Sequence, residues 1–240
     1  MRLRKLGIIG GMGWASTALY YQHLNKDVAR RLGGLHSARV IIESLDFATV
    51  AAFQQAGDWD GAARLLIGCG HRLSAAGAEG IVLATNTMHK VYDRLQLALD
   101  VPVLHIADVT ARRMRADGIV RAGLLGTRFT MREAFFRDRL ERHGIAVVVP
   151  EDDVMRDVDR IIFDELVHGN VSRISQRALK TQINRFAQGK AQAVILGCTE
   201  LALAVDVRAN IIPVYDTTCL HAEAAVDWML SEFEPARAAA

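Results

Sequence analysis

The sequence predicts an α/β protein of two similar lobes, each built on a parallel sheet flanked by helices. Two observations carry this prediction. Apolar runs of strand length alternate with segments of helical period, and the second half of the chain resembles the first. Continuous apolar strands separated by helices are typical of parallel sheets that are covered on both faces. The predicted strands are residues 5–9, 40–44, 80–84, 103–105, 122–125, 146–149, 193–196 and 211–214, and the predicted helices include residues 16–32, 60–76, 132–143, 154–168 and 175–188.

The internal resemblance recurs at nearly one spacing. The stretch GIIG at 7–10 matches GLLG at 123–126, an offset of 123 − 7 = 116. Paired aromatic residues begin at Tyr20 and at Phe135, an offset of 135 − 20 = 115. The stretch IVLATNT at 81–87 matches VILGCTE at 194–200, an offset of 194 − 81 = 113. Three matches in the same order predict two equivalent lobes.

The two lobes are predicted to enclose a ligand site between them. The carboxyl ends of parallel strands are where ligands bind in such folds. We expect the first lobe to comprise residues 1–105 together with 213–240, and the second to comprise 106–212. Polar residues just past the strands are therefore the candidates for chemistry.

The composition excludes several classes of partner. The chain has 240 residues, 51% hydrophobic and 23% charged, which is the ordinary globular range. Its 29 basic and 27 acidic residues leave a net charge of +2 without a basic run, so nucleic acid is not an expected partner. The apolar run at 6–9 is too short for a signal peptide, and no run reaches the roughly 18 residues of a membrane helix. We expect a cytoplasmic protein that does not enter a membrane.

The cysteine pattern gives no sign of a disulfide framework or a metal. Cys69, Cys198 and Cys219 lie far apart, with no Cys-x-x-Cys pair and no cysteine–histidine spacing suited to zinc. Cys69 and Cys219 are expected to be packing residues. No metal site is predicted.

Cys198 differs because the internal match pairs it with Thr85. The two side chains would then face each other across the cleft. Racemisation suits such an arrangement, since it removes a proton from one face of a carbon and returns one to the other. Cys198 follows a predicted strand where backbone N–H groups of a helix start would stabilise a thiolate. The alternative, a buried residue at a strand end, does not explain the polar pair.

Seven ordered motifs resemble the aspartate/glutamate racemase family over almost the whole chain. They are similar most of all to its bacterial branch specific for L-aspartate and L-glutamate. The resemblance implies two α/β lobes, no pyridoxal phosphate, no metal or other cofactor, a small amino-acid substrate and a homodimer. The motifs are GGMGW (10–14), LGGLHSA (32–38), TNTMHK (85–90), LHIAD (104–108), LGTR (125–128), GCTE (197–200) and PVYDT (213–217).

Thr85 departs from the common family pattern, which has a cysteine before the Asn-Thr of the first lobe. A hydroxyl is a poor base, but it can pass a proton to a carbanion or order a water molecule. The family implies that the second-lobe thiol faces the α-hydrogen of the L enantiomer. Cys198 is therefore expected to deprotonate L-aspartate or L-glutamate.

The resemblance also implies a set of substrate-binding residues with backbone and side-chain donors and acceptors. Glu200 would attract the α-ammonium group. The arginine that other members use after the second strand is missing, since residues 44–47 read SLDF, which leaves Arg128 and His89 as candidates for the distal carboxylate. The predicted binding residues are Gly11, Met12, Gln54, Asn86, Thr87, Thr127, Thr199 and Glu200.

Two other functions stay open at this point. An arylmalonate-type decarboxylase of the same superfamily also works with a single thiol in its second lobe. A nucleotide-binding module is indicated by the glycines at 7, 10, 11 and 13 after a strand, although the spacing to an acidic residue is longer than usual. The choice between aspartate and glutamate is also left open.

Overall fold

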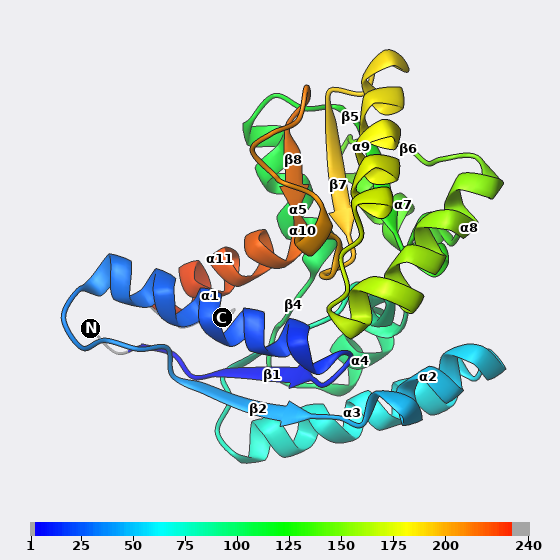
Figure 1. The fold of residues 1–240 in the computed structure, drawn as a ribbon. Helices are drawn as coiled ribbons and strands as arrows, with labels where there is room; N and C mark the ends of the chain where they lie inside the picture. Colours follow the sequence, from blue (N-terminus) through cyan, green and yellow to red (C-terminus); the bar gives the residue numbers. More distant parts are fainter. Residues whose placement is uncertain (1–2, 232–240) are drawn as a thin grey trace.

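The computed structural model describes residues 3–231, which form two lobes with the same strand order (Figure 1). All strand pairs are parallel, with the orders β2-β1-β3-β4 and β6-β5-β7-β8. The predicted fold class is confirmed, and the segments that match in sequence occupy equivalent places. The strands are β1 (Leu6–Gly10), β2 (Val40–Ser44), β3 (Gly80–Leu83), β4 (Val103–Leu104), β5 (Arg121–Gly126), β6 (Ala146–Val148), β7 (Ala193–Gly197) and β8 (Val214–Asp216).

Helices cover both faces of each sheet. The helix predicted at 154–168 is α-helical only in α8, and a π-helical turn and a 3₁₀ turn complete it. The α-helices are α1 (Trp14–Leu32), α2 (Phe47–Ala56), α3 (Trp59–Ala75), α4 (Tyr92–Ala98), α5 (Ile106–Ala116), α6 (Arg128–Arg132), α7 (Ala134–Arg142), α8 (Asp152–Arg160), α9 (Arg173–Gln188), α10 (Leu201–Ala204) and α11 (Thr217–Leu230), and the short turns are η1 (Thr87–Val91), η2 (Ile161–Glu165) and η3 (Leu166–His168).

The last strand begins later than the sequence predicted. The expected strand at 211–214 is observed as β8, Val214–Asp216, which lies at the edge of the second sheet and pairs with β7 alone. Pro213, which has no N–H group to donate, lies just before its first residue. The carbonyl of Pro213 instead accepts a hydrogen bond from the N–H of Val194 at 2.9 Å. Ile211 lies exposed in the preceding turn.

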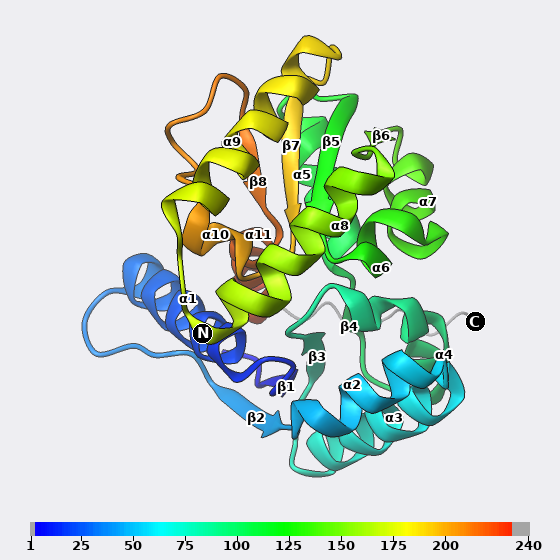
Figure 2. The same cartoon turned by 45° about the vertical axis from the view of Figure 1, so that its right-hand side comes forward.

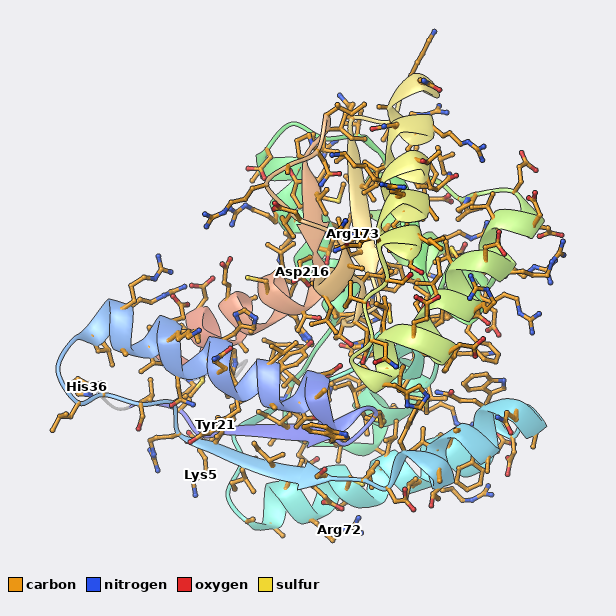
Figure 3. All side chains as sticks on the ribbon, viewed as in Figure 1. Lys5, Tyr21, His36, Arg72, Arg173 and Asp216 are labelled. Atoms are coloured by element: carbon orange, nitrogen blue, oxygen red, sulfur yellow. The ribbon has the colours of Figure 1, made fainter. Side chains whose placement is uncertain are left out.

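Each lobe contributes one helix to the core of the other. α5 follows β4 of the first sheet, yet its apolar residues belong to the core of the second lobe. α11 follows β8 of the second sheet and packs on α1 and the first sheet, as Figure 1 shows for the orange-red and blue helices. Asp216, which is labelled in Figure 3, precedes α11. It caps this helix by accepting hydrogen bonds from the N–H groups of Thr218 and Cys219 at 2.9 and 3.4 Å.

The segment at which the chain returns from the second lobe to the first differs from the one expected. β8 pairs with β7, so the chain returns to the first lobe at Thr217 instead of Pro213. Residues 232–240 of the predicted first lobe lie outside the described residues. The second lobe, with β5, β7 and β8, stands above the first in Figure 2. No helix within residues 3–231 has both the length and the apolar character needed to cross a membrane.

The adjacent residues Phe135 and Phe136 provide a test of the packing in the second lobe. Phe136 is fully buried in the core, whereas Phe135 is partly buried at its edge. We expect Phe136→Ala to lower the free energy of unfolding by about 3–5 kcal/mol, because it leaves a cavity in the core. Phe135→Ala is the matched control and should cost clearly less in urea denaturation. Equal losses would contradict the packing described here.

Candidate active site

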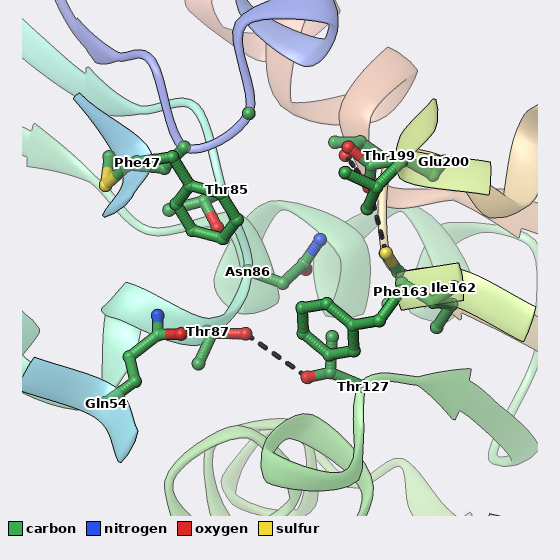
Figure 4. Close-up of a pocket in the computed structure, with 15 residues that line it drawn as sticks. Phe47, Gln54, Thr85, Asn86, Thr87, Thr127, Ile162, Phe163, Thr199 and Glu200 are labelled. Carbon is green, nitrogen blue, oxygen red and sulfur yellow. Dashed lines mark hydrogen bonds between the residues drawn. The ribbon is translucent and has the colours of Figure 1, made fainter. Parts of the chain in front are cut away.

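A pocket of about 470 Å³, partly open to solvent, lies between the lobes at the carboxyl ends of β3 and β7. It contains nine of the ten residues that the sequence singled out. Figure 4 shows Thr85 and Gln54 on one side and Thr199 and Glu200 on the other. The predicted residues that line it are Met12, Gln54, Thr85, Asn86, Thr87, Thr127, Cys198, Thr199 and Glu200.

Gly11 is the predicted residue that does not line the pocket. Its N–H group donates to the Thr17 hydroxyl at 2.8 Å. Its φ of +86° favours glycine, and an added Cβ would lie 2.1 Å from the carbonyl oxygen of Leu45. Gly11 therefore shapes the turn after β1, and Gly13 of the same turn reaches the pocket.

Glu200 is held by donors from both lobes. The Cys198 thiol donates to Oε2 at 3.0 Å and the Thr199 hydroxyl donates to the same oxygen at 2.6 Å. The hydroxyl of Ser16, on α1, donates to Oε1 at 2.7 Å. A second bridge between the lobes joins the hydroxyls of Thr87 and Thr127 at 3.2 Å.

The Cys198 thiol is protonated at rest, contrary to the thiolate that the sequence led us to expect. Burial raises its pKa well above the ordinary value, and the negative charge and hydrogen bond of Glu200 raise it further. The N–H groups of Glu200 and Leu201 favour the thiolate but do not offset these effects. The helix that follows has only four residues. A reaction through this thiol thus requires a base, and Glu200 is already hydrogen-bonded to it.

Thr85 is fixed through its backbone by His89. The N–H of Ile106 donates to Nε2 of His89 at 3.3 Å, so the other ring nitrogen carries the proton. That Nδ1–H donates to the carbonyl oxygen of Thr85 at 2.8 Å. Burial lowers the pKa of His89 to about 4, so the ring stays neutral near pH 7.

Asn86 presents an acceptor without a partner. Its Nδ2 donates to the Thr217 hydroxyl at 3.2 Å, and that hydroxyl donates to the carbonyl of Leu196 at 2.7 Å. These bonds fix the orientation of the amide. Oδ1 of Asn86 is buried and has no hydrogen-bond partner within the described part of the protein. A buried acceptor of this kind calls for a donor from a ligand or water.

Neither candidate for the distal carboxylate reaches the pocket. Both ring nitrogens of His89 are engaged with backbone atoms, as described above, and Arg128 has an exposed side chain outside the lining. Four apolar residues of the lining were not predicted from the sequence: Phe47, Ile162, Phe163 and Val167. Phe47 lies just after the carboxyl end of the second strand, so its position in the sequence could have indicated that it lines the pocket. The other three lie on a segment that resembles an ordinary amphipathic helix.

The other two cysteines lie outside the pocket. Cys69 is buried in the first-lobe core, as expected, whereas Cys219 is only partly buried. Burial raises the pKa of each thiol to about 12. Among residues 3–231 no group of three or more histidine, cysteine, aspartate or glutamate side chains is arranged to hold a metal ion.

Comparisons with known proteins agree with this geometry. The family model described as Asp/Glu/Hydantoin racemase matches residues 9–225. The broad specificity amino-acid racemase RacX of Bacillus subtilis is 26% identical over 228 residues, covering 94% of this chain and 98% of that protein.

Two solved structures extend the likeness to three dimensions. A putative Asp/Glu racemase from Yersinia pestis is 46% identical with a TM-score of 0.90, covering 95% of this chain and 100% of its own. An aspartate racemase homologue from Pyrococcus horikoshii is 34% identical with a TM-score of 0.84, at the same coverage of 95% and 100%.

The effect of Glu200 on the thiol can be measured directly. We expect Glu200→Gln to lower the pKa of Cys198, because it removes the charge that disfavours the thiolate. Alkylation of Cys198 by iodoacetamide at mildly alkaline pH should then accelerate by roughly tenfold for each unit by which the pKa falls. Mass spectrometry of the Cys198 peptide measures this rate.

Glu223→Gln is the matched control for this experiment. Glu223 accepts a hydrogen bond from the Cys219 thiol at 3.7 Å, so its loss should accelerate alkylation of Cys219 and leave Cys198 unchanged. Slower alkylation of Cys198 in Glu200→Gln would contradict the described coupling.

Proposed function

This chain belongs to the Asp/Glu/Hydantoin racemase family, and we propose that it racemises free α-amino acids without a cofactor through Cys198 and Thr85. The observation that supports this proposal is the paired position of the two residues, which follow equivalent strands and line one pocket. The family resemblance supports aspartate and glutamate as substrates. The relative from Bacillus subtilis is a broad specificity amino-acid racemase, which supports a wider range of substrates.

The first step is removal of the α-hydrogen of the L enantiomer by Cys198. Glu200 accepts the thiol proton along the existing hydrogen bond, and the resulting thiolate takes the α-hydrogen. After Glu200 has taken the proton, the positive α-ammonium group of the substrate stabilises the negative charge of the Cys198 thiolate.

The second step returns a proton to the opposite face, on the side of Thr85. The hydroxyl of Thr85, or a water molecule that it orders, donates the proton to the carbanion. Solvent then returns a proton to Thr85, and Glu200 releases to solvent the proton that it took from the thiol, so that both groups regain their resting forms. His89 holds the backbone of Thr85 and does not take part in the proton transfer.

The substrate is proposed to bind through neutral donors and one carboxylate. Oδ1 of Asn86 and the Glu200 carboxylate accept hydrogen bonds from the α-ammonium group. The hydroxyls of Thr87 and Thr127 donate to the α-carboxylate, and Thr199 contributes by holding the Glu200 carboxylate. We retain a homodimer and a cytoplasmic location as proposals that rest on the family resemblance, and gel filtration and cell fractionation test them.

Loss of the thiol tests the proposed function. We expect Cys198→Ala to lower the rate of α-hydrogen exchange in deuterated water by at least about 100-fold, the lower end of general acid–base effects. Cys219→Ala is the matched control and should keep nearly full activity, since Cys219 lies outside the pocket. A Cys198→Ala variant that folds and keeps a tenth of the activity would overturn the assignment.

Because the Thr85 hydroxyl is a weaker acid than a thiol, we expect exchange of the α-hydrogen to be faster than inversion of the α-carbon. The thiol can return a solvent deuteron to the face from which it took the hydrogen before Thr85 or a water protonates the other face. The L isomer should therefore lose its α-hydrogen faster than the D isomer accumulates, and Thr85→Cys should narrow this gap. NMR of deuterium uptake beside chiral chromatography measures both rates. Equal rates in the unmodified protein would contradict this role for Thr85.

A further inference from the structure

Two phenylalanines from different lobes flank the pocket. Phe47 begins α2 of the first lobe, and Phe163 lies on η2 of the second. Figure 4 draws Phe47 on the side of Thr85 and Phe163 on the side of Thr127. Ile162 and Val167 extend the apolar lining from the second lobe. One part of the pocket thus has apolar walls contributed by both lobes.

The charges of the pocket do not suit a second carboxylate. Glu200 is the charged side chain of the lining, and no lysine or arginine within residues 3–231 lines the pocket. The α-ammonium and α-carboxylate of an amino acid cancel each other. A substrate with a carboxylate side chain would therefore add an uncompensated negative charge to a site that already contains one, which low-dielectric surroundings penalise.

The nearest candidate cations along the chain do not line the pocket. Lys90 pairs with Glu133 and lies 3.8 Å from the ring centroid of Trp59. Arg128 is exposed and does not line the pocket, and His89 is neutral. The remaining polar groups beside the apolar walls are neutral, namely the Gln54 amide and the hydroxyls of Thr87 and Thr127.

We propose that Phe47 and Phe163 make this site select α-amino acids with uncharged side chains over aspartate and glutamate. This inference rests on the proposed racemase function and specifies its substrate class. Glutamine and asparagine are the sharpest probes, because each has nearly the shape of the corresponding acid without its charge. Aspartate and glutamate then become poor substrates.

The test compares α-hydrogen exchange of L-glutamine with L-glutamate and of L-asparagine with L-aspartate on the full chain. We expect kcat/KM to favour each amide by at least roughly tenfold, as for an unpaired buried charge. A preference for either acid over its amide overturns the inference. Absence of exchange with every amino acid tested, including these four, would instead count against the proposed function.

A second experiment introduces a positive charge at the position of Phe163. Phe163→Lys should raise the ratio of kcat/KM for glutamate to that for glutamine by roughly tenfold, since it supplies the missing cation. Phe163 is 36% exposed, so the substitution leaves the core intact. Ile174→Lys is the matched control, because it adds the same charge at a site 78% exposed outside the pocket. An unchanged ratio in Phe163→Lys, or an equal rise in Ile174→Lys, counts against the assigned wall.

Discussion

The carboxylate of Glu200 is where the two lobes and the reactive thiol meet. It accepts hydrogen bonds from Cys198 and Thr199 of the second lobe and from Ser16 of the first. A carboxylate withdrawn from water is costly unless such donors surround it. The same negative charge keeps the thiol protonated. One group therefore joins the lobes across the pocket and sets the resting state of the residue proposed to carry the chemistry.

The two lobes share a backbone plan but differ in chemistry at equivalent points. β3 and β7 occupy the same place in their sheets, and the residues that follow them are Thr85 and Cys198. Glu200 accepts a hydrogen bond from the side chain of Cys198, whereas His89 donates a hydrogen bond to the backbone carbonyl of Thr85. Duplication thus accounts for the symmetric placement, and the local partners account for the unequal proton chemistry of the two faces.

Buried neutral histidines hold the chain where it crosses between lobes. The rings of His105 and His221 lie 4.7 and 5.8 Å from that of His89. The Tyr20 hydroxyl lies 2.8 Å from Nδ1 of His221, whose Nε2 lies 3.0 Å from the carbonyl oxygen of Leu104. Burial lowers the pKa of His221 to about 3 and holds that of His105 well below its usual range. Uncharged rings can satisfy backbone groups here without the cost of burying charge.

The sequence by itself determined the fold class, the duplication and most of the pocket, because strand periodicity is local and polar residues at the carboxyl ends of parallel strands converge. The structure alone decided four features. β8 joins the second sheet, Gly11 turns away from the pocket, the Cys198 thiol is protonated, and Phe163 lines the site. Each of these features depends on which segments, far apart in the sequence, pack together. Such contacts produce no recognisable pattern in the local sequence.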